Sequence, residues 1–233
     1  SSIRYDRSMN DNGNSKGQHK SSFFSKNLDC YYGNQPRFQK FVDNVNSQNN
    51  KIILDVGCGD HEKENFFDTS NGNTYIGIDI VGDNNPNIQS SADALPIGDS
   101  QIDFIICDSV LEHVYDPNKV VNEIFRVLKP GGSGYFVVPF SYKNHGAPFD
   151  FYRYTKSDLH TLLRNYSNIY IYPFGGTVHA FGHMVESVYP HLPLGIGKVF
   201  KGFHNIILFF LNKIDKYDKY KLFSRGFYAF VTK

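Results

Sequence analysis

One apolar stretch in the first third of the chain constrains the fold more than any other. Residues 51–60 read KIILDVGCGD, a hydrophobic run that ends in an acid and a Gly-x-Gly turn. A continuous Ile/Leu/Val run without alternation is typical of a central strand in a parallel sheet, covered on both faces. Glycines at its carboxyl end allow a tight turn and a close ligand, so we expect a side chain at Gly57 to enter the ligand's space.

A second strand is predicted at 74–80, TYIGIDI, and it also ends at an acid. An acid in that place can accept hydrogen bonds from both hydroxyls of a ribose. The two strands and their connection therefore predict a nucleoside-binding βαβ unit with Gly57, Gly59 and Asp79 as ligand contacts. Asp55, at the end of the first strand, is expected to support the turn or to face the charged part of the ligand.

The loop between these strands indicates which of two kinds of nucleoside ligand the chain would bind. The dinucleotide fingerprint Gly-x-Gly-x-x-Gly needs a glycine at 62, where this chain has Glu62. A pyrophosphate would also meet several acids near the loop, an unfavourable field for an anion: Asp55, Asp60, Glu62 and Glu64. An adenosine that carries a positive sulfonium suits that field better. An NAD(P)-dependent oxidoreductase is therefore disfavoured and kept as an alternative.

Three segments, taken in order, resemble the motifs of class I S-adenosylmethionine-dependent methyltransferases, and specifically the methyltransferase-11-like family. They are ILDVGCG at 53–59, FIICDSVLEHV at 104–114 and VLKPGG at 127–132. The resemblance implies an α/β fold, a Rossmann-like seven-stranded mostly parallel sheet with helices on both faces, and S-adenosyl-L-methionine as cofactor. The cofactor contacts that it implies are Asp55, Gly57, Cys58, Gly59, Asp79, Ile80, Ser91, Ala92, Asp93, Asp108 and Ser109.

The segment SADALPI at 91–97 is similar to an acid-Ala-x-x-Leu-Pro motif of this family, whose acid contacts the adenine amino group. Aligning the Leu-Pro pair puts Ser91 in the place of the acid and Asp93 two residues late. Either Asp93 makes the contact from a shifted loop, or Ser91 and backbone groups make it. A third interpretation is that Asp93 only forms a local turn with its own backbone.

The loop at 139–155 follows the fifth predicted strand, at 133–139, and so lies beside the reactive end of the cofactor. It resembles the x-Asp-x-Tyr-Arg-Tyr-Thr segment of methyltransferase-11-like enzymes, many of which belong to cell-envelope sugar pathways. It offers four candidate catalytic residues: His145, Asp150, Tyr152 and Arg153. Asp150 and Arg153 could contact the acceptor or could brace the loop as an ion pair. The family position often held by His is Phe149 here, which weakens the case for a base at that site.

The chain divides into three parts. We expect residues 1–34 to be a polar, flexible segment or possible lid. Residues 35–175 and 222–233 are predicted to form the methyltransferase core, and residues 176–221 a substrate-side or surface-helix insertion. Two late strands, 169–172 and 227–231, are expected to pair antiparallel and close the sheet. Within the insertion, residues 196–214 form an apolar helical stripe with flanking lysines. That stripe could cover the core, touch a membrane peripherally or join two subunits in a homodimer.

Composition excludes several classes of partner and site. The net charge of +1 gives no field for nucleic acid. Three cysteines without metal spacing predict reduced thiols in a cytoplasmic protein, and no metal site is expected. We predict methyl transfer to a small-molecule or lipid-linked acceptor, with a cell-envelope sugar as one candidate. The rival interpretation is a catalytically silent methyltransferase fold that serves as a binding module.

Overall fold

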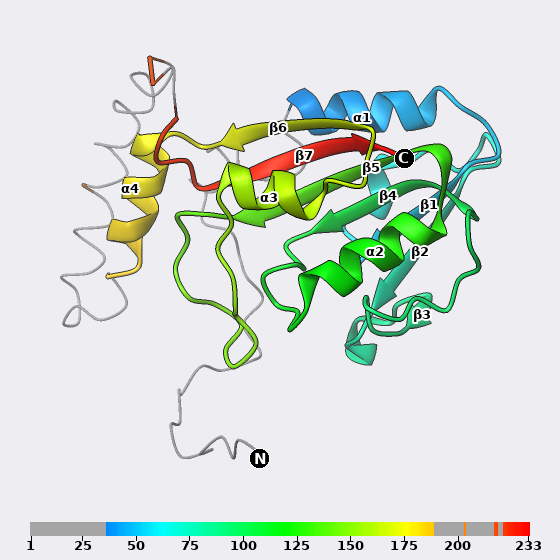
Figure 1. Ribbon diagram of the computed structural model, residues 1–233, viewed down its shortest axis with the longest axis horizontal. Helices are drawn as coiled ribbons and strands as arrows, with labels where there is room; N and C mark the ends of the chain where they lie inside the picture. The colour runs from blue at the N-terminus through cyan, green and yellow to red at the C-terminus, as the bar shows by residue number, and fades with distance from the viewer. Residues whose placement is uncertain (1–35, 189–202, 204–216, 219–220) are drawn as a thin grey trace.

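The computed structural model describes residues 36–188, 203, 217–218 and 221–233. The 1–34 segment and the 196–214 stripe, apart from Phe203, lie outside the described residues, so the expectations for them stay predictions. Figure 1 shows one sheet with helices on both faces. In chain order the elements are α1 (Pro36–Asn46), β1 (Ile52–Val56), η2 (Glu64–Phe66), β2 (Thr74–Asp79), η3 (Gly82–Asn84), β3 (Ile88–Gln89), β4 (Ile102–Asp108), α2 (Pro117–Val127), β5 (Leu128–Pro139), α3 (Lys156–Leu162), β6 (Asn168–Phe174), α4 (Thr177–Glu186) and β7 (Gly226–Thr232).

The sheet has seven strands, as the sequence predicts, and their order is β3-β2-β1-β4-β5-β7-β6. Every neighbouring pair from β3 to β5 is parallel, whereas β7 runs antiparallel to both β5 and β6. The chain moves outward from β1 to β3 and then returns to β4 on the other side of β1. A crevice therefore opens between the carboxyl ends of β1 and β4, which is where open α/β sheets bind ligands.

Both faces of the sheet are covered, because consecutive side chains of a strand point to opposite faces. On one face Phe38 and Phe41 of α1 pack against Ile53, Phe104 and Tyr135. On the other face the apolar side of α2 packs with Leu159 of α3 against the alternate strand residues. The central strand is thus buried from both sides, as its unbroken apolar run predicts.

Two helices start where their sequence places a cap. Asp116 accepts hydrogen bonds from the amides of Asn118 and Lys119, with Pro117 at the first helical position of α2. Thr155 and Asp158 form a capping box at the start of α3. One predicted boundary is wrong: β5 begins at Leu128, not at 133, because Leu128 already pairs with Ile102 before a register shift in β4.

Figure 1 also places α4 beyond the carboxyl end of β6, away from the layers that cover the sheet. This helix belongs to the predicted insertion at 176–221. Phe203, in the same insertion, has 65% of its surface exposed. Among the described residues, no helix combines the length and the apolar character needed to cross a membrane.

Candidate active site

The turn after β1 is held by the next strand. The amides of Gly57 and Cys58 both donate to the carbonyl of Ile78, at 2.7 and 3.0 Å. Gly57 and Gly59 have φ values of +73° and +54°, a region that favours glycine. A Cβ at Gly57 would lie 2.3 Å from a methyl carbon of Val110, whereas at Gly59 it would meet nothing within 4 Å. The expectation for Gly57 is therefore wrong, because packing requires that glycine and the open side of the turn is at Gly59.

Asp79 closes the other side of this opening. Its two carboxylate oxygens accept the backbone N–H groups of Gly59 and Val81, each at 2.9 Å. These bonds fix the carboxylate at the end of β2 and leave lone pairs for two hydroxyl donors. Ile80 follows with 66% of its surface exposed, an apolar contact of the kind that a base plane can cover. Asp79 and Ile80 thus lie where the sequence analysis places the nucleoside.

Asp55 does not reach this opening. It has no exposed surface, and its carboxylate bonds the Tyr75 hydroxyl at 2.5 Å and lies 3.1 Å from Nζ of Lys63. Burial raises the pKa of Asp55, although the Lys63 charge and the Tyr75 hydrogen bond oppose that shift. Of the two roles expected for Asp55, the structure shows the support of the turn, and a contact with the charged part of the ligand stays a prediction. The acidic field expected around the loop is also weaker, because Lys63 offsets one of its four acids.

Cys58 likewise contributes backbone rather than side chain. Its thiol is buried, 3.8 Å from Nε2 of His61, and burial raises its pKa to about 11. A Cβ at Gly77 of β2 would lie 2.6 Å from the His61 ring and 2.8 Å from the Cys58 sulfur. Gly77 therefore makes room for both side chains, a packing role that the sequence analysis did not find for His61.

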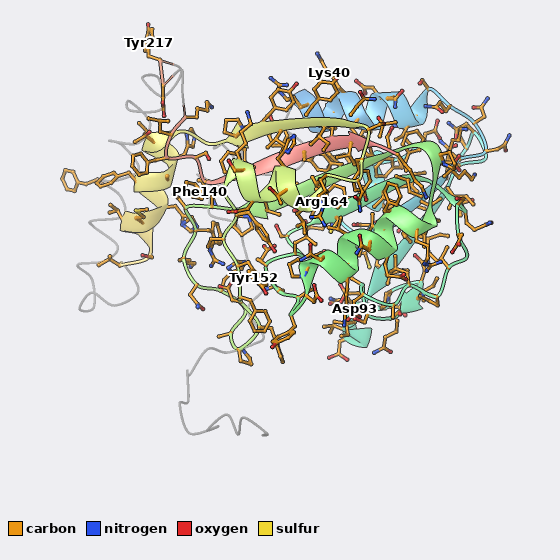
Figure 2. The ribbon with its side chains drawn as sticks, in the orientation of Figure 1. Lys40, Asp93, Phe140, Tyr152, Arg164 and Tyr217 are labelled. Atoms are coloured by element: carbon orange, nitrogen blue, oxygen red, sulfur yellow. The ribbon has the colours of Figure 1, made fainter. Side chains whose placement is uncertain are left out.

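The loop after β3 joins the two residues that the sequence analysis left as alternatives. The Ser91 hydroxyl donates to the Asp93 carboxylate at 2.5 Å, and Ala92 lies between them. Leu95 anchors the loop, because its side chain is buried and its amide donates to Glu123 of α2. Asp93 is exposed beside β3, as its label in Figure 2 shows. The loop therefore presents Ser91 and Asp93 as one bonded pair.

The end of β4 forms the opposite wall of the crevice. Asp108 is buried, and the Ser109 hydroxyl donates to its carboxylate at 2.9 Å. Ser109 has a φ of +57°, and its amide donates to Val137 of β5. The chain therefore turns sharply here and directs residues 110–114 along the top of the crevice.

The loop after β5 is braced by one arginine. Arg153 pairs with Asp150, and its guanidinium also donates to the carbonyls of Tyr142 and Lys143. The Asp150 carboxylate in turn accepts the His145 amide at 2.7 Å. Arg153 holds the pKa of Asp150 well below its usual range. Bracing, one of the two roles left open for this pair, is thus directly visible, and it fixes His145.

Tyr152 points elsewhere. Its hydroxyl donates to the carbonyl of Tyr115 at 2.9 Å, which ties the loop after β5 to the loop after β4. Figure 2 shows Phe140 at the end of β5 and Tyr152 further along the loop that follows. Three of the four candidate catalytic side chains, those of His145, Asp150 and Arg153, therefore lie together. The Tyr152 carbonyl accepts a hydrogen bond from Arg153 at 2.7 Å, but the Tyr152 hydroxyl points to the loop after β4.

Glu112, which the sequence analysis did not select, lies at the centre of the acceptor side. It has no exposed surface, and its Oε1 is 3.8 Å from Nε2 of both His113 and His145. Burial raises the pKa of Glu112 to about 8. The available signal was the Glu-His pair just after a strand end, but the partner His145 comes from a different loop.

Comparisons with known proteins agree with this geometry. A methyltransferase domain family matches residues 54–136. A ubiquinone biosynthesis O-methyltransferase from Hydrogenovibrio crunogenus is 30% identical over 112 residues, which cover 42% of this chain and 46% of that protein. A methyltransferase structure from Archaeoglobus fulgidus, described as dependent on S-adenosylmethionine, has a TM-score of 0.56 at 17% identity and covers 84% of this chain and 91% of its own. Residues 54–136 therefore match a methyltransferase domain, and the fold is one found in S-adenosylmethionine-dependent methyltransferases.

Two features of these matches limit what they say about activity. The chain spans under half the length of the curated relatives it matches, 46% and 43% for two of them. Another structure with the same fold is the (4+2)-cyclase SpnF, with a TM-score of 0.52, 18% identity, and coverage of 84% of this chain and 79% of its own. The fold alone therefore does not decide the reaction, and residues must.

The residues around this opening fit the adenosine part of S-adenosylmethionine. Three features follow one another around the opening. Gly59 lies in a turn with open space beside it, Asp79 has a carboxylate fixed by two amides, and Ile80 has an exposed aliphatic side chain. Together they offer backbone groups, a hydrogen-bond acceptor for the ribose hydroxyls and an apolar surface for the base. Bound there, the cofactor supplies a methyl carbon activated by its sulfonium.

A cavity of about 410 Å³ lies between the start of the loop after β5 and α4. Phe140, Tyr142 and Lys143 line it from the loop, and His183 and Met184 line it from α4. Burial, with the Arg225 charge, lowers the pKa of His183 to about 4, so its ring is neutral near pH 7. This cavity thus has room for a small uncharged or partly aromatic group next to the candidate catalytic loop.

Proposed function

We propose that this chain transfers a methyl group from S-adenosylmethionine to a small-molecule or lipid-linked acceptor held by the loop after β5. The observation that carries the proposal is the Gly59–Asp79 arrangement, which joins an open turn to a fixed ribose acceptor. The cavity beside Tyr142 and His183 supplies space for the acceptor. The (4+2)-cyclase likeness keeps a silent or altered activity as the rival interpretation.

An oxygen atom is the acceptor that we favour. The relative from Hydrogenovibrio crunogenus is named an O-methyltransferase, and the loop after β5 carries a histidine suited to a hydroxyl. The acceptor oxygen forms a bond to the methyl carbon as the carbon–sulfur bond breaks, and the hydroxyl proton must leave. Burial lowers the pKa of His145, so its ring is neutral near pH 7 and can accept that proton.

Most of the acceleration in such a displacement comes from placing the two reactants close and in line. The bracing of Arg153 and Asp150 serves this purpose, because it fixes the backbone on both sides of His145. Acceptor identity then depends on the cavity, and a cell-envelope sugar or a lipid-linked head group are the candidates that the loop resemblance suggests.

Two measurements test the proposal. Calorimetry with S-adenosylhomocysteine, and with NAD in parallel, reports on the cofactor, and we expect binding of the first alone. An acceptor screen over hydroxylated aromatics, sugars and lipid-linked sugars, read out by release of S-adenosylhomocysteine, reports on transfer. Binding without transfer to any acceptor would favour the silent binding module, and preferential binding of NAD would favour the oxidoreductase.

A further inference from the structure

Three groups that donate electron pairs converge in the acceptor side of the site. The ligand atoms of Glu112, His113 and His145 all lie within 4.8 Å of one another. The two imidazole rings meet edge to face, with centroids 4.7 Å apart. Neither oxygen of the fully buried Glu112 carboxylate receives a hydrogen bond from any group that the structure describes.

The backbone contacts of the two rings set their tautomers. Nδ1 of His113 lies 2.5 Å from the carbonyl oxygen of Phe149, and Nδ1 of His145 lies 3.3 Å from that of Lys143. A carbonyl can only accept, so each Nδ1 carries the hydrogen and each neutral ring has its lone pair on Nε2. Two Nε2 lone pairs therefore converge on the Glu112 carboxyl group, and among these three groups only a proton on Glu112 itself could act as a donor.

Direct hydrogen bonds between the two rings and Glu112 do not account for this arrangement. Both Nε2 atoms lie 3.8 Å from Oε1 of Glu112, beyond the range of a direct hydrogen bond. A metal ion with bonds of about 2.1 Å holds its ligand atoms about 3.0–4.2 Å apart, so both separations already fall in range. The outward N–H groups that donate to carbonyls are also what metal-binding histidines show in most proteins.

We propose that Glu112, His113 and His145 bind a divalent transition-metal ion. Two imidazoles and one carboxylate suit Zn²⁺, Mn²⁺ or Fe²⁺, whereas Mg²⁺ and Ca²⁺ prefer oxygen ligands throughout. Three protein ligands leave coordination positions open for a further oxygen. The sequence analysis expects no metal site. The three proposed ligands come from two separate loops, so neither loop alone shows a metal-binding spacing.

The surrounding backbone is arranged to let these loops meet. Gly146 has a φ of +71°, and a Cβ there would lie 2.9 Å from Cε1 of His113. The Phe151 amide donates to the Glu112 carbonyl at 2.8 Å, which joins the two loops a second time. Gly146 therefore permits the close approach of His113 to the segment that carries His145, and the ligand set depends on it.

The role of the ion rests on the proposed function, but its binding does not. A bound acceptor oxygen would lose its proton more easily, since a divalent ion lowers the pKa of a coordinated hydroxyl. With the ion bound, Nε2 of His145 would be a ligand and could not accept the proton. The ion would instead acidify the coordinated hydroxyl, and the released proton would pass to solvent water. Without the ion, His145 keeps the task of the base.

The test measures metal binding directly on the full chain, freed of purification tags and treated with a chelator. Calorimetry with ZnCl₂, together with the visible absorption of a Co²⁺-loaded sample, gives stoichiometry and ligand geometry. We expect one ion per chain. Glu112→Gln, His113→Gln and His145→Gln should each weaken binding by more than the roughly 10–100-fold that changes outside the ligand set cost.

His160→Gln is the matched control, because His160 is an exposed histidine of α3. It should bind the ion as the unaltered chain does. Circular dichroism identifies any variant that fails to fold, and the remaining two ligand variants still decide the question. Absence of binding, or equal binding in all four variants, would overturn the proposal, since the cluster would then hold only a proton.

Parallel titration with S-adenosylhomocysteine separates this inference from the proposed function. Metal binding without cofactor binding would leave the ion site standing and remove methyl transfer. Cofactor binding without metal binding would do the opposite, and His145 would remain as base.

Discussion

The cofactor side and the acceptor side of the crevice are built by different means. Around Gly59 and Asp79 the contacts run between backbone groups and one carboxylate, all from β1, β2 and the turns that follow them. Around His145 the contacts are made by long side chains that reach across loops, above all by Arg153. The first side is therefore sensitive to changes in the backbone, and the second to the loss of single side chains.

The largest effect is expected for Gly57→Val. The new Cβ would meet Val110 at 2.3 Å, and the backbone at +73° disfavours a branched side chain. Overpacking and left-handed strain together should cost about 3 kcal/mol or more of unfolding free energy. Urea denaturation measures this loss. A variant with unaltered stability and no cofactor affinity would show that Gly57 faces the ligand instead.

The second largest effect is expected for Arg153→Ala, which should disturb the acceptor side and leave the cofactor side intact. The change removes hydrogen bonds from a charged group to Asp150 and to three carbonyls. Bonds of this kind contribute about 1.5–3 kcal/mol, so the melting temperature should fall measurably. Transfer activity should fall with it. The affinity for S-adenosylhomocysteine should stay within about twofold, well below the tenfold change that about 1.4 kcal/mol of binding free energy produces.

Arg164→Ala provides the control for that change. Arg164 is an exposed arginine after α3, with a hydrogen bond to the nearby Thr161 carbonyl. Its loss should leave both the melting temperature and transfer nearly unchanged. If Arg153→Ala melted like the unaltered protein yet lost transfer, Arg153 would act on the acceptor rather than as a brace.

Asp79→Ala tests the cofactor side through a side chain. The carboxylate holds the Gly59 and Val81 amides and is placed for the ribose hydroxyls. Loss of a charge-assisted acceptor should weaken S-adenosylhomocysteine binding by about 1–3 kcal/mol. Calorimetry provides the measurement, and unchanged affinity would move the nucleoside away from the end of β2.

Gly59→Ala sharpens the same point with a matched partner. Gly59 and Gly131 both have positive φ, and a Cβ at either would meet nothing within 4 Å. The conformational cost, about 1 kcal/mol, should therefore be similar for the two alanine variants. Only Gly59→Ala should also lose cofactor affinity. Gly131 lies away from the proposed cofactor site, near the amino end of β5, where its amide donates to the Lys233 carbonyl. Equal affinities in the two variants would place the ligand elsewhere.

The same contrast explains what the sequence could predict. The seven-stranded, mostly parallel sheet and the place of Gly59, Asp79 and Ile80 after strand ends follow from apolar runs, turn glycines and terminal acids, which are local signals. The sequence did not decide between the two roles of Asp55, because its partners Lys63 and Tyr75 depend on how the turn folds back over β2. Glu112 was missed because its burial between two histidines exists only after two distant loops meet.

The smallest effect is expected for Tyr152→Phe, which asks whether the fourth candidate residue belongs to the site. The hydroxyl already donates to the Tyr115 carbonyl, and the ring is partly exposed, so a hydroxyl engaged in joining two loops is not free to act on an acceptor. Removing it should cost about 0.5–1.5 kcal/mol, because a neutral hydrogen bond at a solvent-accessible position contributes little net stability. Thermal melts should show that modest loss, and transfer and cofactor affinity should stay unchanged. A large fall in transfer at an unchanged melting temperature would instead place the Tyr152 hydroxyl against the acceptor, and the acceptor side would then extend from His145 to the loop after β4.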